Sequence, residues 1–139
     1  MKNDRQIPME VVELEEETIH LLVKVEHDEL ENHWWVVDTG ASKSVIDRAV
    51  AAVLVGEESA GSMATGLGKE MVETSTGEIS DFRLCGINFG VLKVAIVDLH
   101  HINEEYSKYS DKRIAGLLGS DFFYREKATI DYKSKLILL

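Results

Sequence analysis

A short apolar run leads directly into an aspartate. Residues Trp34-Trp35-Val36-Val37 are followed by Asp38-Thr39-Gly40-Ala41-Ser42. Burying a lone carboxylate at the end of such a run costs free energy, so the charge needs hydrogen bonds or a chemical task. Gly40 permits a tight turn with close backbone approach, and Thr39 offers a hydroxyl that can tie the turn to a neighbour. From these residues alone, Asp38 is either a general acid–base group or part of an ordinary turn.

Other reactive side chains lack the partners that chemistry would require. Of the five histidines, His100 and His101 are adjacent, and no His-x-x-x-His or Cys-x-x-Cys pair occurs. Cys85 is the single cysteine, so no intramolecular disulfide forms, and we expect it to be a small buried hydrophobe. Gly66-Leu67-Gly68 lacks the Lys-Ser/Thr ending of a phosphate-binding loop. The sequence therefore predicts no metal site and no cofactor.

Strand patterns dominate the rest of the chain. Runs rich in apolar and β-branched residues predict strands over 11–15, 19–25, 34–37, 82–84, 91–97, 114–119, 128–131 and 135–139. Asp47 is the expected N-cap of a short helix that ends before Gly56, and Ser120-Asp121 are expected to cap another through Glu126. Residues 59–77 suit an exposed glycine-rich hairpin, and 100–113 form a polar, partly helical insertion. These patterns predict a mainly β domain with one or two short helices.

Length and composition bound the class of protein. The chain has 139 residues, 45% hydrophobic and 29% charged, which predicts one domain over 1–139 with residues 1–9 loosely ordered. A net charge of −10 disfavours binding to nucleic acid. No stretch approaches the roughly 18 apolar residues of a membrane span, and residues 1–5 do not resemble a leader. The sequence as written therefore predicts a cytoplasmic protein that does not bind membranes.

Taken together in this order, the motifs resemble those of the retropepsin-like aspartic proteases, the family of the retroviral proteases. The matching features are the apolar run into Asp38-Thr39-Gly40-Ala41-Ser42, the Gly-rich hairpin 64–69, the Ile114–Gly119 run, and a short helix followed by a final strand. The resemblance implies an acid-protease half-barrel in which Asp38 is catalytic and Thr39, Gly40, Ala41 and Ser42 support its loop. It also implies a flap over Thr65, Gly66, Leu67 and Gly68. Gly116, Leu117, Leu118 and Gly119 would form the strand behind the catalytic loop.

The chemistry of this family requires two carboxylates that share one proton. The chain carries one Asp-Thr-Gly run and is too short for a second lobe, so we expect a homodimer that cleaves extended peptides. The resemblance assigns Thr39 to locking the two loops together. The C-terminal strand 135–139 is either part of an inter-subunit sheet or an internal core strand.

Ala41 and two departures from the family pattern affect these expectations; the departures are the run Gly119-Ser120-Asp121 and the insertion over 100–113, which is longer than the compact viral enzymes need. Ala41 replaces the serine of pepsin-like enzymes and removes a hydroxyl that stabilises the ionised carboxylate, so we expect activity between weakly acidic and near-neutral pH. Gly119-Ser120-Asp121 stands where retroviral members often have Gly-Arg-Asn/Asp, and it lacks the arginine that helps to hold their dimer. The alternatives are therefore a catalytically silent module for dimerisation or peptide binding, and an inactive monomer.

Overall fold

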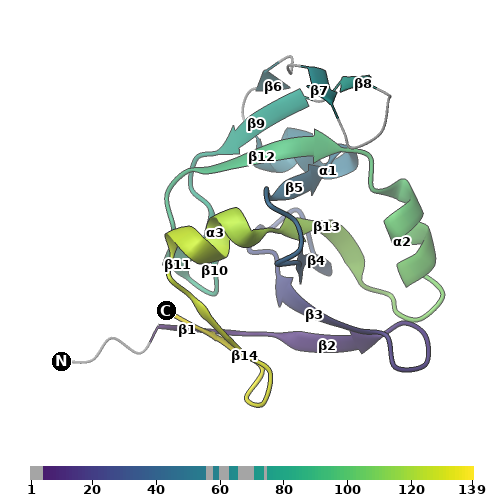
Figure 1. Ribbon diagram of the computed structural model, residues 1–139, viewed down its shortest axis with the longest axis vertical. Coiled ribbons are helices and arrows are strands. Elements are labelled where there is room, and N and C mark those ends of the chain that lie inside the picture. Colours follow the sequence, from purple (N-terminus) through teal and green to yellow (C-terminus); the bar gives the residue numbers. More distant parts are fainter. Residues whose placement is uncertain (1–4, 56–57, 60–62, 66–70, 74) are drawn as a thin grey trace.

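Among the described residues, the main sheet has eight strands in an order that differs from their order in the sequence. The computed structural model describes residues 5–139 except 56–57, 60–62, 66–70 and 74. The strands, in spatial order, are β2 (Glu10–Glu13), β3 (Ile19–Lys24), β4 (His33–Val37), β13 (Arg113–Leu118), β5 (Val45–Asp47), β12 (Leu92–Val97), β9 (Ser75–Ile79) and β6 (Glu58–Ser59) (Figure 1).

Strand β13 lies between β4 and β5 although it comes late in the sequence. It runs parallel to β4 and antiparallel to β5. The segment 38–44, which joins β4 to β5, therefore passes around the C-terminal end of β13. This arrangement brings the Asp38 turn and the Gly119 turn together.

Side chains alternate across the sheet and bury a core on each face. On β4, Trp35 belongs to the larger buried cluster with Phe122, whereas Trp34 and Val36 belong to the smaller cluster on the opposite face. Trp34 and Trp35 therefore face opposite sides of the sheet, as adjacent residues of a strand do. Both faces of β4 are therefore buried up to the point where Asp38 follows.

In the described part of the chain, three short helices complete the fold. They are α1 (Arg48–Leu54), α2 (His100–Tyr106) and α3 (Ser120–Arg125). The predicted N-cap of α1 is confirmed, because Asp47 Oδ1 accepts a hydrogen bond from Ala49 N. The predicted caps of α3 are wrong, because the N-cap is Gly119 and no side chain bonds there. The carboxylate of Asp121 bonds to Ser44 instead.

The two ends of the chain form a separate three-stranded sheet. Its order is β1 (Gln6–Pro8), β15 (Leu136–Leu138) and β14 (Thr129–Asp131). The expectation of a loose segment over 1–9 is wrong for Gln6–Met9, because Ile7 and Met9 are buried in the core; residues 1–4 lie outside the described part of the chain. Strand β15 has a neighbour from its own chain on both sides, which favours the internal core interpretation of the C-terminal strand.

Two hairpins project from this framework. One pairs β7 (Met63–Thr65) with β8 (Met71–Glu73), and the other pairs β10 (Arg83–Leu84) with β11 (Ile87–Asn88). Cys85 lies in the turn of the second hairpin with a φ of 50° and is exposed. The expectation of a buried cysteine is therefore wrong, since the turn points its side chain away from the core.

Candidate active site

Asp38 follows the last residue of β4 and continues the pairing of that strand with β13. Its N–H donates to Leu118 O at 2.9 Å. Its side chain is partly buried, whereas the next two residues, Thr39 and Gly40, are exposed. The carboxylate therefore emerges from the core at a surface of the molecule.

The turn itself orients this carboxylate. Asp38 Oδ1 accepts a hydrogen bond from Gly40 N at 3.1 Å, and Asp38 O accepts one from Ala41 N at 3.1 Å. A Cβ added to Gly40 would lie 3.3 Å from Asp38 Oδ1, which is a tight contact. A backbone N–H donor that faces the carboxylate stabilises its charge without help from another side chain.

A buried polar cluster fixes the far end of the loop. Ser44, which is fully buried, donates from its backbone N to Asp121 Oδ2 at 3.0 Å and from its hydroxyl to Asp121 Oδ1 at 2.8 Å. Its Oγ also accepts a hydrogen bond from Gly119 N at 2.9 Å. Ser44 was not identified by the sequence analysis. The feature that could have indicated it is a hydroxyl side chain directly before the apolar pair Val45-Ile46.

Two glycines allow the loop and strands to approach closely. A Cβ on Gly116 would lie 2.2 Å from Val45 O and 2.5 Å from Trp35 Cζ3. A Cβ on Gly119 would lie 2.6 Å from Ala41 O, which also accepts a hydrogen bond from Ser120 N at 2.8 Å. Neither site has room for a larger residue, so glycine is required at both.

The structure brings most of the predicted site residues together. Asp38, Thr39, Gly40, Ala41 and Ser42 form one loop, which is held against the end of the 116–119 segment by the contacts above. Within that segment Leu118 is fully buried and Leu117 is partly exposed.

Of the four predicted flap residues, Thr65 lies in the described part of the chain. Thr65 ends β7 and pairs with Met71 of β8. Gly66, Leu67 and Gly68 lie outside the described residues. A hairpin thus exists where the flap was expected, and its role remains a prediction.

Among the described residues, no group of three His, Cys, Asp or Glu side chains is arranged to hold a metal ion. Within the same part of the chain, no helix is long and apolar enough to cross a membrane.

Comparison with known proteins identifies the family. Residues 23–122 match the family model described as aspartyl protease, and this span contains the Asp38 loop, β13 and the start of α3. The chain belongs to the aspartyl protease family. Among solved structures, this aspartyl protease family member is similar to a retropepsin-like aspartic protease from Rickettsia conorii, with a TM-score of 0.50 and 15% identity. The alignment covers 100% of this chain and 94% of that chain, which confirms the predicted retropepsin-like, mainly β fold. No curated protein sequence matches.

Proposed function

We propose that the protein is an aspartic endopeptidase whose active site contains Asp38 from each of two copies of the chain. The observation that carries this proposal is the Asp38 turn. A partly buried carboxylate ends an apolar strand, accepts a hydrogen bond from Gly40 N, and sits on a loop anchored to β13 and α3. Membership of the aspartyl protease family supports the same assignment.

The proposed reaction uses the two carboxylates as an acid–base pair. Like charges about 3 Å apart do not both ionise easily, so the pair holds one proton near its working pH. The ionised carboxylate removes a proton from water as the water oxygen attacks the peptide carbonyl carbon, and the neutral one donates its proton to the carbonyl oxygen. The tetrahedral intermediate then collapses, the C–N bond breaks, and a proton passes to the leaving amine. No cofactor is needed.

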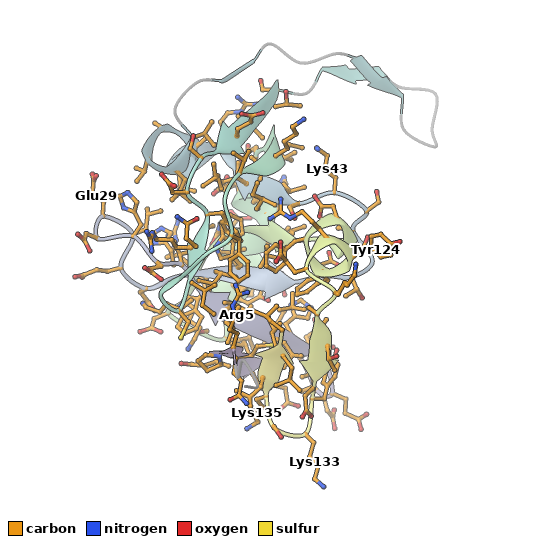
Figure 2. The ribbon with its side chains drawn as sticks, turned by 90° about the vertical axis from the view of Figure 1, so that its left-hand side faces the viewer. Arg5, Glu29, Lys43, Tyr124, Lys133 and Lys135 are labelled. Atoms are coloured by element: carbon orange, nitrogen blue, oxygen red, sulfur yellow. The ribbon has the colours of Figure 1, made fainter. Side chains whose placement is uncertain are left out.

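A second copy of the chain supplies what one copy lacks. Asp38 Oδ1 is bonded to the backbone N–H of Gly40, and the chain contains a single Asp-Thr-Gly run. Thr39 and Gly40 are exposed beside Asp38, as residues of a contact between two loops would be before assembly. Lys43, from the same loop, and Tyr124 of α3 lie on the same side of the molecule, away from Glu29 (Figure 2). We assign this side to the two-fold contact and Thr39 to the lock between the loops.

The proposed substrate is an extended peptide segment. Main-chain hydrogen bonds to the enzyme would hold it, and its alternating side chains would enter pockets. The β7–β8 hairpin is the candidate flap that closes over it and excludes water.

Cleavage of a diverse peptide library between about pH 4 and about pH 7.5 tests the proposal. Wild type is compared with Asp38→Asn and with the matched control Asp28→Asn, which changes an exposed aspartate in the turn before β4. We expect Asp38→Asn to lose at least about 10⁴-fold in rate and Asp28→Asn to retain wild-type activity. Cleavage that survives in Asp38→Asn contradicts the proposal. Peptide binding by a stable dimer without any cleavage would favour the silent binding module instead.

A further inference from the structure

Helix α2 lies on the same face of the main sheet as Asp38. Side chains on a strand alternate, so Asp38 points to the same side as Trp34 and Val36. Both belong to the buried cluster that contains Leu99, which precedes α2, and Tyr106, which ends it. Figure 1 shows α2 where β12 finishes and β13 begins, away from α3. The insertion therefore covers part of the face that carries the proposed catalytic carboxylate.

Hydrogen bonds at several points fix α2 to the sheet. The Asn103 side chain bonds both backbone groups of Ile114: its Oδ1 accepts from Ile114 N at 2.7 Å and its Nδ2 donates to Ile114 O at 3.0 Å. Leu99 N donates to Asp47 Oδ1 at 3.0 Å. The hydroxyl of Tyr106 is hydrogen-bonded to Nδ1 of His20 on β3. These contacts attach α2 to the sheet at its start, its middle and its end.

Part of the apolar surface between α2 and Asp38 is open to solvent. Four hydrophobic side chains pack against the buried cluster but stay partly exposed, namely Val45, Val97, Ile102 and Leu117. We call these four residues the α2 strip. Leu117 pairs with Val45 across β13 and β5, and it precedes Leu118, whose carbonyl accepts the hydrogen bond from Asp38 N. The strip thus begins beside Asp38 and reaches α2.

The handedness of the chain indicates which flank of α2 meets this strip. We view the sheet from the face that carries Trp34 and Val36, with β13 running upward, so that the Ile114 side chain points at the viewer. An L-residue in this orientation has its backbone N–H and C=O on the right. Asn103, which bonds both groups of Ile114, therefore lies to the right of β13. The helix therefore starts on the right and ends on the left, where Tyr106 meets His20 on β3. In a right-handed helix running this way, Ile102 lies on the flank towards Asp38.

We propose that α2 is a wall of the substrate-binding surface, and that Ile102 limits the size of the apolar substrate side chain that the α2 strip accepts. This inference rests on the proposed protease function. The occupant is a substrate side chain close to the scissile bond, since the strip adjoins Asp38. In the two-fold dimer there are two such strips, one for each side of the scissile bond.

The test changes the size of residue 102 and measures selectivity. The selectivity is the ratio of two kcat/KM values, one for peptides with tryptophan or phenylalanine and one for peptides with valine at the same position beside the scissile bond. Ile102→Ala should raise this ratio by about tenfold. Ile102→Phe should lower the same ratio by about tenfold. The control His101→Ala, on the outer face of α2 with 95% of its side chain exposed, should leave the ratio unchanged. If both Ile102 variants still cleave peptides and neither changes the ratio, the inference is overturned.

A binding measurement separates this inference from the protease function. The probe is an extended hexapeptide in which a hydroxyethylene group replaces one amide, added to methyl-labelled protein. We expect the Ile102 methyl NMR signal to shift and that of Ile87, on β11 at the other cluster, to stay in place. If wild type never cleaves but Ile102 shifts, the protease function fails and the strip stands as a peptide-binding surface. Binding that leaves Ile102 unchanged contradicts the strip, and no binding contradicts both.

Discussion

Asp121 holds Ser44 through both of its carboxylate oxygens, one to the backbone N–H at 3.0 Å and one to the hydroxyl at 2.8 Å. The Ser44 hydroxyl in turn accepts the N–H of Gly119. These three residues connect the end of the Asp38 loop, the turn after β13 and the first turn of α3. The orientation of Asp38 therefore depends on residues far from it in the sequence.

Substitution Ser44→Ala should destabilise the fold and impair catalysis together. It leaves Gly119 N–H and one Asp121 oxygen without their partner in a buried site, which costs about 1–3 kcal/mol in the free energy of unfolding. Urea denaturation measures this loss, and peptide cleavage measures the fall in kcat. The control Ser134→Ala, at an exposed position in the turn between β14 and β15, should change neither. Equal stability of the two variants would show that the Ser44 cluster does not support the loop.

Gly116→Ala should be among the most damaging small substitutions in the chain. Its Cβ would lie 2.2 Å from a backbone oxygen of β5, so β13 and β5 would have to separate. We expect a loss of about 3 kcal/mol or more in the free energy of unfolding. Gly86→Ala is the comparison, because no atom lies within 4 Å of its Cβ and only its φ of 80° is unfavourable. That variant should lose about 1 kcal/mol, and a larger loss than in Gly116→Ala would contradict the packing argument.

Stability should fall at alkaline pH through Tyr106. Burial raises the pKa of the Tyr106 hydroxyl well above its usual value. The unfolded chain therefore releases this proton near pH 10 while the folded protein retains it, so rising pH favours unfolding. The contribution of the Tyr106 hydroxyl to the free energy of unfolding is fully present below about pH 10. Above about pH 10 it decreases by about 1.4 kcal/mol per pH unit. Denaturation of wild type and Tyr106→Phe between about pH 8 and about pH 11 isolates this slope. Parallel curves for the two proteins would refute the assignment.

Thr39→Ala should weaken the proposed dimer without unfolding the chain. Thr39 is exposed in the single copy, so its loss removes little from the folded monomer. If its hydroxyl locks the two loops, the dissociation constant should rise by about tenfold or more. Sedimentation equilibrium measures this, with Thr129→Ala, at an exposed position of β14, as the comparison. An unchanged dissociation constant would remove Thr39 from the interface.

The sequence predicts those features that depend on local patterns. The apolar run before Asp38, the N-cap at Asp47 and the opposite orientations of Trp34 and Trp35 each follow from a few adjacent residues. These patterns were sufficient to predict a mainly β fold and the strand on which the candidate carboxylate lies. The family resemblance extended this prediction to the retropepsin-like fold, which the structural comparison confirms.

The remaining features depend on contacts between distant segments. Ser44 and Asp121 are 77 residues apart, and nothing next to either residue indicates the other. Ile7 pairs with Ile137, so the order of the N-terminal segment is set by the opposite end of the chain. The place of α2 depends on Asn103 bonding Ile114 and on Tyr106 reaching β3. A polar insertion read in isolation carries none of this information.

The central claim is that one active site contains Asp38 from two chains, and mixing subunits tests it most directly. Wild type and Asp38→Asn are combined in equal amounts, allowed to exchange, and assayed at constant total protein concentration. If each site needs both carboxylates, only dimers of two wild-type chains cleave, and activity should fall to about a quarter of the unmixed wild type. A fall to about one half would mean that each chain works alone, and would contradict the account.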